Sequence, residues 1–79
     1  MTWIQKQNSE TKYLFKEFKF NDFIAALDFI NQVGSLAESM DHHPIIWNCY
    51  NIVKLELHTH SENAITQKDY DLAKAIDSL

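Results

Sequence analysis

The 79-residue sequence has a single cysteine, a single glycine and no long apolar run. One cysteine cannot close an internal disulfide bond, so we expect a reducing compartment, by default the cytoplasm. No apolar run approaches the roughly 18 residues that suggest a membrane span, and we expect no secretory leader. The sequence also lacks the glycine-rich motifs that cradle phosphates or dinucleotides. These absences argue against a membrane protein and against a nucleotide-dependent enzyme.

Positive charge is also scarce. Seven basic residues face eleven acidic ones, for a formal net charge of −4. This balance argues against nucleic-acid binding, which needs a concentrated Lys/Arg surface. The composition, 46% hydrophobic and 13% aromatic, indicates one folded domain over residues 1–79. A chain of this length buries only roughly 60% of its unfolded surface, so we expect a homo-oligomer.

The first half of the chain predicts two strands and a helix. Residues 3–7 read as an edge strand, and residues 13–20 alternate as a half-buried strand does. Asn21 or Asp22 then supplies a helix N-cap before an amphipathic helix over residues 23–40.

The apolar surface of this predicted helix is wider than packing on one sheet requires. Its second stripe contains Ala25, Phe29, Leu36 and Met40. Such a stripe indicates either imperfect amphipathicity or a face that packs on a partner subunit. Gly34 costs helix stability but permits another element to approach closely.

The second half predicts two strands and a terminal helix. Residues 45–50 are apolar on both parities, as in a strand covered on both faces, whereas residues 53–57 alternate. Thr66 and Asp69 fit a capping box, followed by a helical stripe that ends at Leu79. The predicted class is α+β, with a four-stranded antiparallel sheet, two helices on one face and the order β-β-α-β-β-α.

Four histidines are crowded into one stretch, namely His42, His43, His58 and His60. Adjacent histidines project in different directions, so at least one of His42 and His43 should reach a cleft or solvent. Pro44 biases the preceding residue toward an extended conformation and stiffens this loop. Glu38 precedes His42 by one helical turn and could orient its ring by a hydrogen bond.

Residue chemistry alone leaves several interpretations of these histidines open. His58 and His60 are spaced as a ligand pair on one strand face, which would suit a metal ion. Cys49 could serve as a nucleophile, although a cysteine inside a strand is also typical of core packing. Imidazoles titrate near neutral pH, so the histidines could act as general acids and bases. They could equally be surface residues without chemical function.

The sequence resembles the pterin-4a-carbinolamine dehydratase family over nearly its whole length, from about residue 3 to residue 79. The resemblance rests on a shared order and spacing of residues: Glu38, then His42-His43-Pro44, Trp47-Asn48-Cys49-Tyr50-Asn51, Val53, Leu55, Leu57, Thr59-His60 and Asp69. Two positions depart from the family pattern. Ile45-Ile46 follows His-His-Pro where an acidic residue is common, and Asn63-Ala64 stands where glycine is usual. Asparagine tolerates left-handed backbone, so the turn can survive.

The resemblance implies roles for individual residues. The catalytic residues it implies are His42, His43, His60 and Asp69, and the substrate-binding or supporting residues are Glu38, Pro44, Trp47 and Thr59. Asp69 could instead only complete the capping box. Trp47 and Tyr50 could line the pterin site or pack in the core. His58 has no counterpart among the implied catalytic residues, and we expect a surface residue there.

The implied activity is that of a 4a-hydroxytetrahydrobiopterin dehydratase, a hydro-lyase of tetrahydrobiopterin recycling. It eliminates water from 4a-hydroxytetrahydropterin to give quinonoid dihydropterin, by histidine acid/base catalysis and without a metal or cofactor. The resemblance also implies a homodimer or homotetramer. The family includes a dimerisation cofactor of a homeodomain transcription factor, so the alternative is a non-catalytic protein-binding or assembly module of the same fold.

Overall fold

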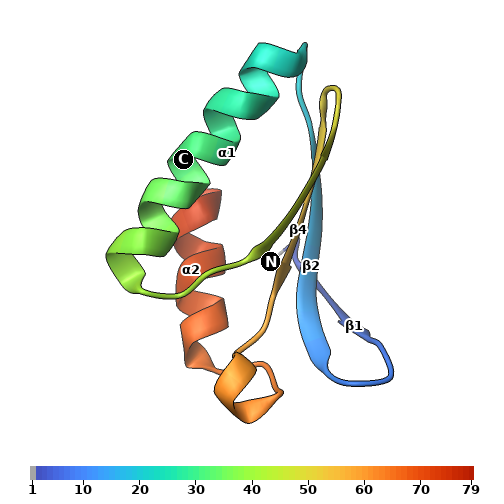
Figure 1. The fold of residues 1–79 in the computed structure, drawn as a ribbon, viewed down its shortest axis with the longest axis vertical. Coiled ribbons are helices and arrows are strands. Elements are labelled where there is room, and N and C mark those ends of the chain that lie inside the picture. Colours follow the sequence, from blue (N-terminus) through green and yellow to red (C-terminus); the bar gives the residue numbers. More distant parts are fainter. Residues whose placement is uncertain (1) are drawn as a thin grey trace.

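The computed structural model describes residues 2–79, which form a four-stranded sheet and two α-helices. In chain order the elements are β1 (Ile4–Gln7), β2 (Lys12–Lys19), α1 (Phe23–Met40), β3 (Ile45–Cys49), β4 (Ile52–Leu57), the short 3₁₀ helix η1 (His60–Glu62) and α2 (Gln67–Asp77). Both α-helices cover the same face of the sheet (Figure 1). The predicted fold class and element order are confirmed. Within residues 2–79, no helix is long and apolar enough to cross a bilayer.

The sheet is antiparallel throughout, in the order β1-β2-β4-β3. β2 and β4 are the central strands, with Leu14 opposite Leu57 and Phe18 opposite Val53. β1 and β3 are therefore the two edge strands, as predicted for residues 3–7. This order matters for function because the end of β4 leads directly to His58 and His60.

The core lies between the helices and the central strands. Its buried side chains come from one face of the sheet, from both helices and from Trp3: Trp3, Leu14, Ala26, Phe29, Val33, Val53, Leu55, Leu57, Leu72, Ala73 and Ile76. Val53, Leu55 and Leu57 alternate with half-buried polar residues, which confirms the predicted alternation of this strand. Burying apolar side chains of this kind contributes about 1.5–3 kcal/mol each, so this layer is the main source of stability.

Helix α1 has the predicted bounds and a defined start. The side chain of Asp22 accepts a hydrogen bond from the backbone N–H of Ala25 at 2.8 Å and caps the helix. Phe29 belongs to the core, where its ring packs on Phe18 at a centroid distance of 4.7 Å. Part of the second apolar stripe predicted for this helix is therefore buried in the core of the chain and is not available to a partner subunit. Met40, at its end, stays 37% exposed.

β3 differs most from prediction. Ile45, Ile46 and Trp47 expose 46%, 38% and 47% of their surface, so the expectation of a strand covered on both faces is wrong for the single chain. The reason is topological, because β3 pairs only with β4 at the end of the sheet. Cys49 and Tyr50 are exposed too, so neither joins the core. Apolar composition alone does not distinguish a central strand from an apolar edge strand.

The two ends of the chain are joined by a polar contact on the helical side of the sheet. Trp3 donates its indole N–H to Asp77 Oδ1 at 3.0 Å, and Lys16 Nζ lies 2.7 Å from the same oxygen. Helix α2 ends at Asp77, so Leu79 lies beyond it and is 50% exposed. The predicted apolar stripe of α2 therefore stops at Ile76, and the expectation that it includes Leu79 is wrong.

The only glycine yields a prediction about stability. A Cβ added to Gly34 would have no atom within 4 Å, so the close approach of another element that glycine permits is not found among residues 2–79. Glycine inside a helix costs about 0.5–1 kcal/mol relative to alanine. Gly34→Ala should raise the free energy of unfolding by that amount in urea titrations. Ser35→Ala, one position later in α1, is the comparison and should raise it by less, because serine is a better helix former than glycine. A loss of stability would contradict the open space and point to a second copy packed there.

Candidate functional site

Three of the four histidines gather around one open cleft. The cleft is lined by residues from the end of α1, the segment after β4 and the start of α2. These three segments lie in the lower part of Figure 1. The cleft has a volume of about 380 Å³ and is lined by Asp41, His42, His43, Thr59, His60, Ser61 and Lys68. Four of these residues were predicted from the sequence as site residues, and the fold brings them together from segments far apart in the chain.

The end of α1 determines which histidine meets which carboxylate. Asp41 adopts the left-handed conformation (φ 49°, ψ 44°), and the N–H of His42 returns to the carbonyl of Ala37 at 3.0 Å. The chain thus leaves the helix before His42, and the expected hydrogen bond between Glu38 and His42 does not form. His43 pairs with Glu38 instead, with Nε2 2.7 Å from Oε1. Both side chains of this pair are largely exposed.

His42 is directed at Asp69, which lies 27 positions later in the chain. Its Nε2 is 2.6 Å from Asp69 Oδ1, and the Asp69 side chain is completely buried. An ionised carboxylate can only accept, so His42 donates from Nε2 and keeps Nδ1 free. The pair therefore fixes both the ring orientation and the tautomer of His42.

The second oxygen of Asp69 is held by two further donors. The Thr59 hydroxyl and the Thr66 backbone N–H both donate to Oδ2, each at 2.9 Å. Thr59 has only one proton, so its 2.7 Å contact with Thr66 Oγ1 is donated by Thr66. The Thr66 oxygen in turn accepts the Asp69 backbone N–H, which completes the predicted capping box. Within residues 2–79, no buried side-chain polar atom lacks a partner.

His60 enters the cleft from the 3₁₀ helix η1. This turn ends at Asn63, which adopts the left-handed conformation at φ 51°. The asparagine thus does what glycine does at this point in the family pattern, as expected. The His60 side chain is exposed, and its ring packs on the ring of His58 with 4.2 Å between centroids.

The geometry gives little support to a metal site or to Cys49 as a nucleophile. Across residues 2–79, no three His, Cys, Asp or Glu side chains are grouped so that they could hold a metal ion. Cys49 lies exposed at the end of the edge strand β3 and does not line the cleft. Imidazoles with free ring nitrogens at an open cleft are suited to transferring protons.

Some predicted site residues lie outside the cleft lining, and some lining residues were not predicted. Glu38 reaches the site only through His43, while Trp47 is on β3 under the ammonium group of Lys54. The unpredicted lining residues are Asp41, Ser61 and Lys68. Each is next in sequence to a predicted site residue, and this adjacency is the only feature of the sequence that could have indicated them.

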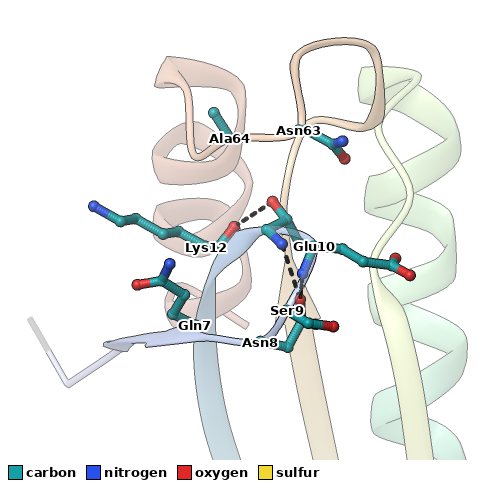
Figure 2. Close-up of a pocket in the computed structure, with 8 residues that line it drawn as sticks. Gln7, Asn8, Ser9, Glu10, Lys12, Asn63 and Ala64 are labelled. Carbon is teal, nitrogen blue, oxygen red and sulfur yellow. Dashed lines mark hydrogen bonds between the residues drawn. The ribbon is translucent and has the colours of Figure 1, made fainter.

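A second hollow, shown in Figure 2, lies elsewhere and has different chemistry. It is formed by the turn between β1 and β2 and by Asn63 and Ala64, with a volume of about 260 Å³. The Asn8 side chain is occupied there as an acceptor for the N–H groups of Glu10 and Thr11. No imidazole lines this hollow, so we place the functional site at the histidine cleft.

Comparison with known proteins identifies the family to which the chain belongs. Residues 2–79 match the family described as pterin 4 alpha carbinolamine dehydratase, and the chain belongs to this family. A protein of Sulfolobus acidocaldarius, named as a candidate pterin-4-alpha-carbinolamine dehydratase, is 42% identical over 96% of this chain and 84% of its own length. A protein of Prochlorococcus marinus with the same designation is 46% identical over 99% of this chain and 85% of its own.

Solved structures share the fold. The crystal structure of a transcriptional coactivator/pterin dehydratase from Brucella melitensis is 38% identical and superposes with a TM-score of 0.88, covering 98% of this chain and 80% of that one. A pterin dehydratase-like protein, identified as a RuBisCO assembly factor in the alpha-carboxysome, superposes with a TM-score of 0.82 over 99% of this chain and 88% of its own. It is only 20% identical, so this second likeness concerns the fold alone.

The support of the buried carboxylate can be tested by stability. Thr59→Val keeps the shape of the side chain but removes one of the donors to Asp69 Oδ2. A hydrogen bond to a charged group contributes about 1.5–3 kcal/mol, so the free energy of unfolding should fall by that amount in chemical denaturation. Thr11→Val, in the exposed turn between β1 and β2, is the matched control and should change it by less than about 0.5 kcal/mol. Equal stability of the Thr59 and Thr11 variants would contradict the assigned network.

Proposed function

We propose that this protein is a 4a-hydroxytetrahydrobiopterin dehydratase, which removes water from a 4a-hydroxytetrahydropterin to give the quinonoid dihydropterin. The proposal rests on one observation: this chain belongs to the family, and its cleft is lined by His42, His43 and His60. The place we propose for this reaction is the recycling of tetrahydrobiopterin. The substrate is a small heterocycle whose recognition needs no basic surface, consistent with the net charge of −4.

The reaction needs one proton removed and one delivered. The pterin ring nitrogen beside the carbinol carbon loses its proton, the carbon–oxygen bond breaks, a carbon–nitrogen double bond forms, and the hydroxyl leaves as water after gaining a proton. We assign the base and acid roles to His42 and His60, and we assign His43 to binding the hydroxyl. Steps of this kind contribute about 10²- to 10⁴-fold each. His42 offers Nδ1 for this work, because Nε2 is engaged with Asp69.

The remaining residues support these histidines. Asp69 has no exposed surface, so it acts through His42 as a positioning residue and does not touch substrate. Thr59 holds Asp69, and Glu38 orients His43. Pro44 restricts the backbone just after His43. Trp47 lies outside the cleft lining, so the single chain gives no support to a substrate contact by its ring.

We also propose a homodimer or homotetramer. The support is β3, whose outer edge has no neighbour in the sheet and whose Ile45, Ile46 and Trp47 are exposed. Exposed apolar edge strands invite pairing with another chain. A covered β3 would also account for the apolar residues on both parities of this strand.

A second candidate function is a non-catalytic protein-binding or assembly module. The same exposed β3 favours it, and one fold relative is described as a RuBisCO assembly factor. The retained His42, His43 and His60 favour the enzyme, because a binding role does not need three imidazoles at one cleft. Tight binding of a protein partner without any acceleration of dehydration would favour the module.

Activity tests the catalytic assignment. His42→Ala and His60→Ala should each lower kcat/KM for dehydration by about 10²-fold or more, and the double variant should approach the uncatalysed rate. The assay follows formation of quinonoid dihydropterin from carbinolamine that a phenylalanine hydroxylase reaction supplies. Glu62→Ala, two residues after His60 on the same turn and outside the cleft lining, is the control. Full activity of a folded double variant would refute the assignment.

Assembly is tested by a charge on the edge strand. Ile46→Lys should shift the oligomer toward monomer in size-exclusion chromatography with light scattering, because an edge lysine opposes strand pairing. Ile24→Lys is matched in chemistry, is 63% exposed and lies in the first turn of α1, so it should leave the assembly unchanged. A wild-type protein that is monomeric at concentrations where it is active would argue against the oligomer.

A further inference from the structure

The three cleft histidines are held in two different ways. His42 is hydrogen-bonded through Nε2 to the carboxylate of Asp69, and His43 is hydrogen-bonded through Nε2 to the carboxylate of Glu38. In the part of the chain that the structure describes, the His60 ring has no hydrogen-bond partner. Its aromatic contact is the ring of His58, at 4.2 Å between centroids and a tilt of 40°. His58 itself does not line the cleft.

We propose that His58 is a positioning residue for His60, which it holds by the ring face and not through a ring nitrogen. The inference rests on the proposed dehydratase function and deepens it. It gives a role to a residue that the sequence pattern treated as a surface bystander. His58 stands behind the cleft and acts on the substrate only through His60.

The backbone between the two rings makes this contact well defined. Thr59 is 4% exposed and is anchored twice. Its N–H bonds to the carbonyl of Ala64 at 2.9 Å, and its hydroxyl bonds to Asp69 at 2.9 Å. The backbone at Thr59 is therefore held in place, and so are the starting positions of the His58 and His60 side chains on either side of it. Their side chains meet on one side of it, where His60 begins the η1 turn.

The mode of contact has a chemical consequence. A carboxylate partner occupies one ring nitrogen, so His42 and His43 each have a single nitrogen available to substrate. A tilted ring contact occupies none, and His60 keeps both nitrogens free. A neutral imidazole with both nitrogens free can donate from one and accept at the other. The aromatic contact restrains the ring without removing this capacity.

The test compares two replacements of His58. His58→Ala removes the contacting ring and should lower kcat for dehydration by about 2- to 10-fold, the effect expected of one aromatic pair. His58→Phe restores an aromatic ring without any ring nitrogen and should recover activity to within about twofold of wild type, since the ring contact suffices. KM should change less than kcat, because His58 does not line the cleft. Glu56→Ala, two residues earlier along β4, is the control.

A double-mutant cycle separates this inference from the proposed function. If His58 acts through His60, the His58→Ala effect should vanish in a His60→Ala background. NMR signals of the His60 ring should shift and broaden in His58→Ala and return in His58→Phe. Wild-type kcat in His58→Ala, or an effect that persists without His60, would overturn the inference while leaving the dehydratase in place. Full activity of His60→Ala alone would instead remove the proposed role of His60.

Discussion

The carboxylate of Asp69 is the point on which the site depends. A charged group with no exposed surface costs several kcal/mol unless donors surround it, and here His42, Thr59 and Thr66 provide them. These donors come from the segment after α1, from the end of β4 and from the start of α2. None of the three segments can shift without exposing or orphaning the carboxylate. One buried charge thus sets the shape of the cleft and the orientation of His42.

The three cleft histidines differ in how firmly they are held, and the differences follow from burial. His42 is nearly enclosed and paired with a buried acid, so its ring and tautomer are fixed. His43 is oriented by Glu38 in an exposed contact, which contributes little to stability. His60 is restrained by the ring of His58 alone. The cleft thus combines one buried, rigidly held imidazole with two exposed ones.

β3 lies next to the site in the chain and carries the proposed assembly surface. The loop that carries His42 and His43 runs directly into this strand, whose outer edge is apolar and unpaired in the single chain. A small chain has a limited core, so covering such an edge with a second copy adds buried area where the fold lacks it. Any partner that covers β3 would also stiffen the segment leading out of the cleft. The proposed assembly surface and the histidine cleft are therefore neighbours along the backbone.

Local patterns in the sequence determined the elements. The alternation of Val53, Leu55 and Leu57, the apolar period of residues 23–40 and the capping box of Thr66 each depend on near neighbours, so they could be predicted and are confirmed. The resemblance to a family supplied the histidines of the site. Only the tertiary structure decided which carboxylate meets which histidine, because the left-handed turn at Asp41 ends α1 before His42 and directs that ring to Asp69, 27 positions away. It also decided that β3 is an edge strand, since strand order depends on how distant segments pair and not on the composition of one strand.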